Sequence, residues 1–120
     1  MGFRIKRVYD PYEQSDGKRV LVDRLWPRGM SRERAKLDEW MKDVAPSPAL
    51  RTWFSHKTER FDEFSRRYLE ELRLDGQKQP ALKALWQMGR EGTVTLLYGA
   101  RDPKINHAAV LLSYLREHEE

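Results

Sequence analysis

Three segments of the chain have the hydrophobic pattern of β-strands. Phe3–Tyr9 (FRIKRVY) alternates apolar and basic residues, which predicts a strand with one face in solvent. Arg19–Arg24 and Thr93–Tyr98 instead hold apolar residues in succession, as expected of strands that are covered on both faces. The link DPYEQSDGKR between the first two strands is short for a parallel crossover, so their relative direction stays open.

Between and after these strands the apolar residues recur with helical spacing. Ser31 can cap a short helical turn, and the apolar positions of Leu37–Val44 fall on one helical face. Ser47 followed by Pro48 is a helix-start signal. Three longer helices are expected: from Thr58 to the Asp75-Gly76 pair, from Pro80 to Gly89, and over the apolar residues 108–115.

This order of elements predicts an α/β fold, in which helices cover a small, mostly parallel sheet. The chain of 120 residues is long enough for one hydrophobic core and too short for two. We therefore expect a single domain over residues 1–120.

The composition excludes several classes of protein. No run approaches the roughly 18 apolar residues of a membrane span, and the N-terminus MGFRIKRVYD lacks the apolar region of a signal peptide. A cytoplasmic protein without a membrane partner is expected. The chain has no cysteine, which rules out disulfides, thiolate zinc sites and cysteine nucleophiles. It also has no clustered metal ligands, no Walker loop and no GxGxxG, so we expect neither a metal nor a cofactor.

The net charge of +4 is concentrated near the start of the chain. Residues 1–36 hold ten Lys/Arg and five Asp/Glu, or +5, and the other 84 residues therefore carry −1. Arginines outnumber lysines 15 to 8, which favours planar, bidentate contacts to phosphate or carboxylate. A basic face that is merely solvated explains the excess equally well.

Polar residues follow two of the predicted strands. In an open α/β sheet, ligands bind beyond the carboxyl ends of the strands, at a switch in strand order. If the strands that end at Asp23 and Tyr98 are parallel neighbours, the residues after them meet at one edge. The candidate ligand-binding residues are Arg24, Trp26, Arg28, Tyr98, Arg101 and Asn106, and the candidate catalytic residues are Asp23, Asp102 and His107.

Each group of candidates has a chemical role and a structural alternative. The arginines would hold an anion, Trp26 and Tyr98 would stack on a ligand, and His107 with a carboxylate would move protons. Asp23-Arg24 can equally be a local ion pair, and Trp26 a lid on the core. Asp102 before a proline, and Asn106, are both suited to cap a helix.

The segments VLVDRLWPRG, LDEWMKDVAPSPALRTWF and VTLLYGARDPKINHAAVL together resemble the domain of unknown function 488 family, YeaO-like branch. The resemblance covers nearly the whole chain, and the DRLWPRG string is quite specific to it. It implies a small bacterial or archaeal cytosolic α/β protein whose signature is the two strand-end motifs. It implies no particular reaction.

The resemblance also bears on chemistry. It implies that other branches carry Cys-His-Arg where this chain has Asn106-His107-Ala108, and a helix between the first two strands. A parallel first pair is then favoured, with DPYEQSDGKR as the shortened remnant of that helix. Without the cysteine, any chemistry would rest on Asp23, Asp102 and His107.

Three functions are compatible with these features. The leading hypothesis is a small enzyme or binding protein for an anionic ligand, such as a nucleotide or a phosphorylated metabolite. The second is nucleic-acid binding by residues 1–36, and weak, salt-sensitive binding is expected from the charge alone. The third is an interaction module without catalysis. The first requires Val20–Asp23 and Thr93–Tyr98 to be parallel neighbours, and one cleft to contain Arg24, Arg28, Arg101 and His107.

Overall fold

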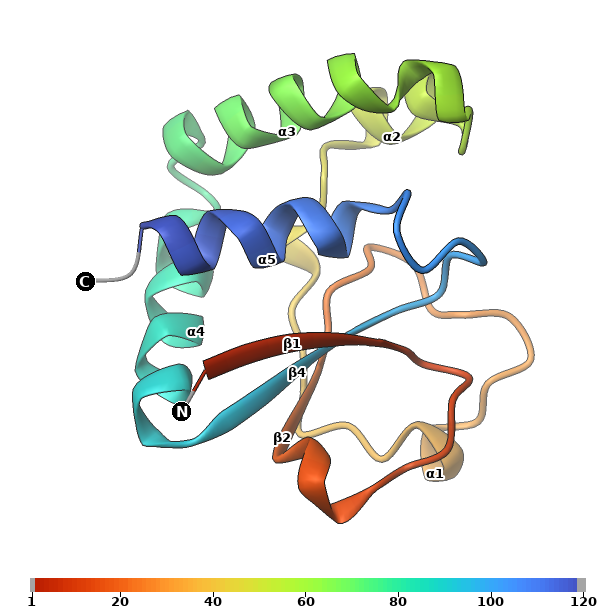
Figure 1. The fold of residues 1–120 in the computed structure, drawn as a ribbon, viewed down its shortest axis with the longest axis vertical. Coiled ribbons are helices and arrows are strands. Elements are labelled where there is room, and N and C mark those ends of the chain that lie inside the picture. The colour runs from red at the N-terminus through yellow and green to blue at the C-terminus, as the bar shows by residue number, and fades with distance from the viewer. Residues whose placement is uncertain (1, 119–120) are drawn as a thin grey trace.

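Four strands form one parallel sheet: β1 (Gly2–Arg7), β2 (Lys18–Leu21), β3 (Glu39–Trp40) and β4 (Thr93–Tyr98) (Figure 1). The computed structural model describes residues 2–118. The strand order is β1-β4-β2-β3, so the last strand in the sequence lies between the first two. β1 and β2 therefore do not pair with each other, and each runs parallel to β4. The α/β class and the predicted β2–β4 pairing are confirmed.

Five helices and three short 3-10 turns complete the fold (Figure 1). The helices are α1 (Arg32–Ala35), α2 (Pro48–Phe54), α3 (Phe61–Leu74), α4 (Gln79–Glu91) and α5 (His107–Glu117), and the turns are η1 (Gln14–Asp16), η2 (Lys42–Val44) and η3 (Thr58–Arg60). Both predicted serine caps are confirmed. The Ser31 hydroxyl accepts the N–H of Arg34, and the Ser47 hydroxyl accepts the N–H of Leu50.

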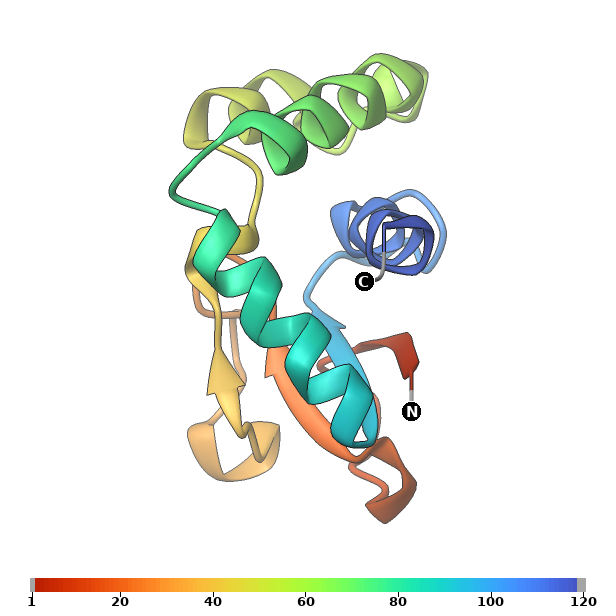
Figure 2. The same cartoon turned by 90° about the vertical axis from the view of Figure 1, so that its left-hand side faces the viewer.

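Adjacent residues of β2 and β4 face opposite sides of the sheet, as strand geometry requires. Val20 and Leu96 belong to the main core, which α2, α3, α4 and α5 share, whereas Leu21 and Leu97 belong to a second cluster beside α1. In Figure 2, α4 crosses in front of the sheet and α1 lies behind it. The prediction that these strands are covered on both faces is confirmed.

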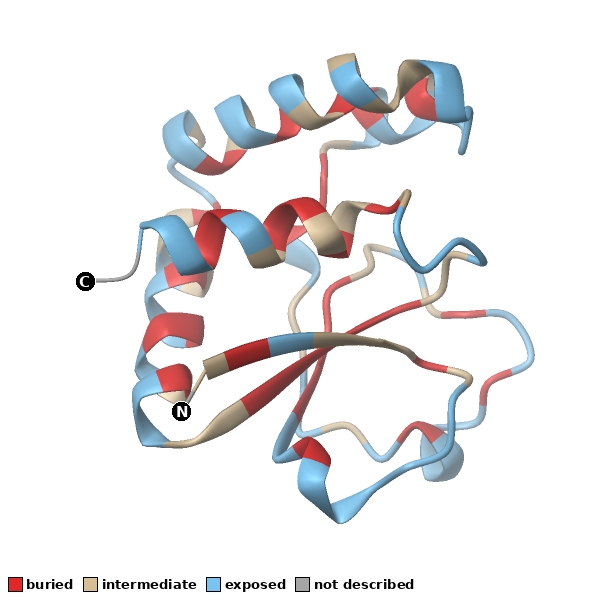
Figure 3. Cartoon of the chain, in the orientation of Figure 1, coloured by how far each residue is buried: buried red, intermediate tan, exposed pale blue. Residues whose placement is uncertain are grey.

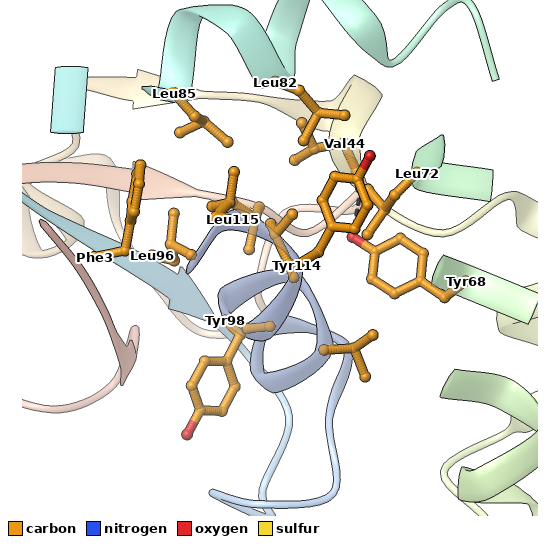
Figure 4. Close-up of a cluster of buried hydrophobic side chains, with 14 of the residues drawn as sticks. Phe3, Val44, Tyr68, Leu72, Leu82, Leu85, Leu96, Tyr98, Tyr114 and Leu115 are labelled. Carbon is orange, nitrogen blue, oxygen red and sulfur yellow. Dashed lines mark hydrogen bonds between the residues drawn. The ribbon is translucent and has the colours of Figure 1, made fainter. Parts of the chain in front are cut away.

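The main core joins the sheet to the long helices. Phe3 of β1, Leu96 of β4 and Leu115 of α5 meet there (Figure 4), and α3 is buried along the side that faces α5 (Figure 3). The hydroxyl of Tyr68 donates to the Val44 carbonyl at 2.5 Å, which satisfies a buried polar group. Burial, followed by nearby carboxylates, raises the pKa of Tyr68 well above its usual value.

The helix predicted over Leu37–Val44 is wrong. This segment forms β3 and then η2, and the Met41 N–H donates to a β2 carbonyl at 2.9 Å. Its apolar residues do not share one face: Leu37 and Trp40 pack on the second cluster, whereas Met41 and Val44 pack on the main core. Pairing with β2 on the sheet edge has overridden the helical spacing.

Two predicted helix boundaries also differ from the structure. α3 begins at Phe61 after a 3-10 turn, and α4 continues past Gly89 to Glu91. Gly89 has a packing role instead, because a Cβ there would lie 2.6 Å from the ring of Phe3. The glycine allows β1 to approach α4 closely.

On the second face of the sheet, the buried carboxylate of Asp16 is bonded to cations from two strands. Arg19 of β2 donates to one oxygen at 2.5 Å, and Lys6 of β1 donates to the other at 3.1 Å. The Thr95 hydroxyl of β4 donates to the backbone carbonyl of Asp16 at 2.7 Å. Asp16 and Arg19 are each 1% exposed. Burial opposes the charge of Asp16, but the Glu13 N–H and the two cations outweigh it, so the pKa of Asp16 lies below its usual value.

We expect Asp16→Asn to lower the free energy of unfolding by about 3 to 5 kcal/mol, because it leaves the buried Arg19 guanidinium without its counter-charge. Urea denaturation at neutral pH measures this change. Because the folded pKa of Asp16 is lowered, its contribution is present above the ordinary carboxyl pKa of 3.8. It is lost as the pH falls through the lowered folded value. The variant should therefore lose less stability than the wild type on acidification.

Glu39→Gln is the matched control, since it removes one negative charge from an exposed position of β3. Its free energy of unfolding should stay within about 0.5 kcal/mol of the wild type. Equal destabilisation by both substitutions would mean that net charge, and not the Asp16 contacts, explains the effect.

Candidate functional site

A cavity of about 530 Å³ opens at the carboxyl edge of the sheet, where β2 and β4 end. After β2 the chain turns to α1 on one side of the sheet, and after β4 it turns to α5 on the other (Figure 1). Such a switch point is where open α/β sheets bind ligands. The cavity is lined by Arg24, Arg28, Arg101 and His107 together, which confirms the predicted shared cleft.

The ends of the two strands are tied together by Asp23. Its Oδ2 accepts the backbone N–H of Gly99 at 2.9 Å, one residue beyond β4. The Val22 N–H donates to the Leu97 carbonyl at 3.0 Å, which continues the strand pairing up to this point. A Cβ on Gly99 would lie 3.0 Å from the Asp23 carboxylate, so a side chain here would push the two loops apart.

His107, the first residue of α5, contacts the same strand end. Its Nε2 lies 3.0 Å from the Val22 carbonyl and 3.2 Å from Oδ1 of Asp23. Both neighbours are acceptors, so Nε2 carries a proton and donates. Within residues 2–118, Oδ1 of Asp23 is buried and makes no hydrogen bond, so the Nε2 proton of His107 is donated to the Val22 carbonyl.

This arrangement fixes the chemistry of the imidazole. With the proton on Nε2, the neutral ring has its lone pair on Nδ1, and the side chain is 16% exposed at the cavity wall. His107 can therefore accept a hydrogen bond or a proton from a bound molecule, while the Val22 carbonyl orients the ring.

The cavity wall is strongly cationic. Five arginines line it against one carboxylate, that of Asp23: they are Arg7, Arg24, Arg28, Arg51 and Arg101. Within the described part of the chain, none of the five pairs with a carboxylate. Elsewhere Arg66 and Arg67 of α3 pair with Glu63, and the buried Arg19 of β2 pairs with Asp16.

Arg7, the last residue of β1, and Tyr9, just beyond it, contact the loops that follow the other strands. The Arg7 Nε donates to the Ala100 carbonyl at 2.8 Å, and its guanidinium lies 5.0 Å from the Tyr9 ring centre. The Tyr9 hydroxyl donates to the Arg28 carbonyl at 2.6 Å. These contacts hold the loops after three strands in one wall.

The opposite wall comes from α2 and the segment that leads into it. The buried ammonium of Lys78 donates to the Ala45 carbonyl at 2.6 Å and to the Asp43 carbonyl at 3.2 Å. Burial lowers the pKa of Lys78, although nearby carboxylates oppose the shift. Arg24 lies 3.4 Å from the same Ala45 carbonyl and from that of Pro46. The position of α2 is thereby fixed from both sides.

Two predicted site residues lie outside the cavity. Tyr98 is 2% exposed and belongs to the main core (Figure 4), so it cannot stack on a ligand there. The reason is strand alternation, which turns this last residue of β4 toward the helices. Asp102 is exposed, and its carboxylate accepts the N–H groups of Lys104 and Ile105 at 2.8 and 3.0 Å. The Ile105 and Lys104 N–H groups lower the pKa of Asp102. Its local bonds are those of a turn.

Two others line the cavity with their polar groups already bonded. The Asn106 carbonyl oxygen accepts the Ala109 N–H at 2.8 Å, and its amide donates to the Asp102 carbonyl at 2.8 Å. Asn106 is therefore the cap of α5. The Trp26 indole donates to the Met30 carbonyl at 2.7 Å, and its ring meets that of Trp40 edge-on at 5.3 Å. The bonds of Asn106 and Trp26 are therefore those of the structural roles considered above, a helix cap for Asn106 and a packed indole for Trp26.

The sequence reasoning missed several lining residues. Arg7 was overlooked because nothing local indicates that β1 lies beside β4. Arg51, Phe54 and His56 were not among the predicted site residues, because only tertiary packing brings α2 and the turn after it to the cavity. Within residues 2–118, no helix is long and apolar enough to cross a membrane, and no group of three or more His, Asp or Glu side chains can hold a metal ion.

The fold and this pocket define a small parallel α/β protein with a cationic cavity at the carboxyl edge of its sheet. The chain belongs to the DUF488 family: a family model described as the "Inactive DUF488-N3 subclade" matches residues 2–120. The resemblance noted from the sequence is confirmed. No solved structure gives a significant match.

Several uncharacterised bacterial proteins are close relatives. The chain is 45% identical to the uncharacterized protein YeaO of Escherichia coli over 97% of this chain and 98% of that protein. It is 44% identical to the uncharacterized proteins Mb3100c of Mycobacterium bovis and Rv3073c of Mycobacterium tuberculosis, over 93% of this chain and 92% of each.

We expect Trp26→Ala to lower the free energy of unfolding by about 3 kcal/mol, because it removes an indole packed on the second cluster and leaves the Met30 carbonyl without its donor. Arg28→Ala should change the free energy of unfolding by less than about 0.5 kcal/mol, because Arg28 is exposed and pairs with no described carboxylate. Urea denaturation of both variants separates the two roles. Strong destabilisation by Arg28→Ala would mean that Arg28 is structural.

Proposed function

We propose that this protein binds a small anionic ligand, a nucleotide or a phosphorylated metabolite, in the cavity at the carboxyl edge of its sheet. One observation carries the proposal: five arginines that lack carboxylate partners within residues 2–118 line a single cavity. Gathering like charges opposes folding, so their presence in one cavity is explained by a function.

The chemistry of the wall fits this class of ligand. Guanidinium groups bind phosphate oxygens in a bidentate manner, which explains arginine instead of lysine at all five positions. A cavity of about 530 Å³ lies in the size range of small-molecule sites. Phe54, Phe64 and Trp26 give it an apolar part that suits the body of a nucleotide or sugar.

We propose binding, not turnover, as the function. The family description carries the word "Inactive", and the chain has no cysteine. His107 and Asp23 would then orient the ligand, with Nδ1 of His107 accepting a hydrogen bond from it. We retain the cytoplasmic location expected from the sequence as part of this proposal.

Nucleic-acid binding by the basic residues 1–36 is the second candidate. Three of their ten cations, Arg4, Lys6 and Arg19, contact the carboxylate of Asp16, which reduces the charge open to a phosphate backbone. The third candidate, an interaction module, would leave the cavity without a ligand. The small-ligand hypothesis therefore ranks first.

We expect isothermal titration calorimetry at low salt to detect at least one ligand in a panel of nucleotides and phosphorylated sugars. Arg28→Ala and Arg101→Ala should each weaken that binding about tenfold, or about 1.4 kcal/mol, because each loses a charge-assisted contact. Arg73→Ala is the control, since it removes an exposed arginine of α3 that does not line the cavity. Equal losses of affinity in all three variants would mean that the net charge of the protein, and not contacts in the cavity, explains the weaker binding.

Single-stranded and duplex oligonucleotides separate the second candidate from the first. We expect only weak binding that disappears when salt is raised, as counterion release requires. Tight binding that survives high salt and prefers particular bases would move nucleic acid to first place.

A further inference from the structure

The cationic side chains of the cavity come from two walls. The strand-end wall holds three arginines: Arg7 at the end of β1, Arg28 after β2 and Arg101 after β4. The helix wall holds Arg51 of α2, His56 after it, and Arg24, whose guanidinium contacts the segment leading into α2. Each wall therefore supplies several donors for an anionic group.

The helix wall keeps an unfavourable backbone conformation. Ser55 and His56 have φ angles of 46° and 56°, so two successive residues other than glycine are left-handed. The first of these ends α2, where the Ser55 N–H donates to the Arg51 carbonyl. The second continues the turn at the point where His56 lines the cavity. Each left-handed residue of this kind costs energy, and such strain concentrates at ligand sites.

The carboxylate of Asp23 does not compensate the positive charge of the five cavity arginines. Its Oδ2 accepts the N–H of Gly99, its Oδ1 lies 3.2 Å from Nε2 of His107, and within residues 2–118 it forms no ion pair with the five cavity arginines. A monoanion on one wall would leave the guanidinium groups of the other wall without a partner. A ligand with two anionic groups can neutralise both walls at once.

From these observations we propose that the ligand carries two phosphate groups, as in a nucleoside diphosphate or a sugar bisphosphate, and that one group binds each wall. This inference rests on the proposed function and narrows its ligand class. Arg51 and His56 of the helix wall are then specificity-determining residues, because they contact the second phosphate only.

Matched pairs of probes test the inference by calorimetry: inorganic phosphate and pyrophosphate, adenosine monophosphate and diphosphate, and fructose 6-phosphate and 1,6-bisphosphate. In at least one pair, the second phosphate should tighten binding on the order of tenfold to a hundredfold. Arg51→Ala should remove most of that gain, because it weakens binding of the doubly phosphorylated probe more than binding of the monophosphate. Arg73→Ala should preserve the gain, since it lowers the net charge outside the cavity.

A second pair of variants tests the strained turn. Ser55→Gly and His56→Gly each relieve a left-handed residue, so each should raise the urea midpoint of unfolding. His56→Gly should also weaken binding of the doubly phosphorylated probe about tenfold, whereas Ser55→Gly should leave it unchanged. Unchanged binding in both variants would overturn the role of His56.

The results of these titrations distinguish failure of the two-phosphate inference from failure of the proposed anion binding. If both members of every pair bind equally and Arg101→Ala weakens both, the protein binds anions but the inference of two phosphates is overturned. The same holds if the gain persists in Arg51→Ala. If no probe in the panel binds, the proposed function fails together with the inference.

Discussion

The pairing of three strands depends on one buried carboxylate. Asp16 and the residue before it bind the side chains of Arg4, Thr95 and Arg19, which lie in one row across β1, β4 and β2. Because the strands are parallel, the register at this row also determines which residues of β1, β4 and β2 are neighbours at the carboxyl ends of the strands. At that edge Asp23 comes within hydrogen-bonding distance of Gly99, and the cavity opens. The ionic cluster at one position of the sheet thus sets the geometry of the pocket at its end.

The surroundings of the arginines differ between the Asp16 cluster and the cavity. Around Asp16 the buried Arg19 and the partly buried Lys6 pair with its carboxylate, and Arg19 makes two further bonds to the Ala35 carbonyl, at 3.1 and 2.8 Å. Around the cavity the arginines are exposed or partly buried and meet carbonyls or solvent. Within residues 2–118, the cations around Asp16 are paired with a carboxylate, whereas the cavity arginines are not. The proposed function rests on the gathering of these unpaired arginines in one cavity.

The sequence predicted the parts of the structure that local chemistry controls. The bounds of β4, the serine caps of α1 and α2, and the adjacency of β2 and β4 all follow from patterning and capping. What failed depended on tertiary neighbours. The segment 37–44 became a strand because β2 offered it backbone partners, and Tyr98 turned to the core because alternation along β4 requires it. Arg7 and His56 join the site only through the position of β1 and the turn after α2, which no local pattern encodes.

The central position of β4 has a consequence for how the chain folds during synthesis. β1 and β2 are joined only through β4, which lies between them in the sheet and spans Thr93–Tyr98 of the 120 residues. The ribosome must therefore release most of the polypeptide before the sheet can form. Contacts so distant in sequence slow folding, and the nascent chain exposes two unpaired strand edges meanwhile. We expect a chain of this topology to stay incompletely folded until β4 is available to pair with β1 and β2.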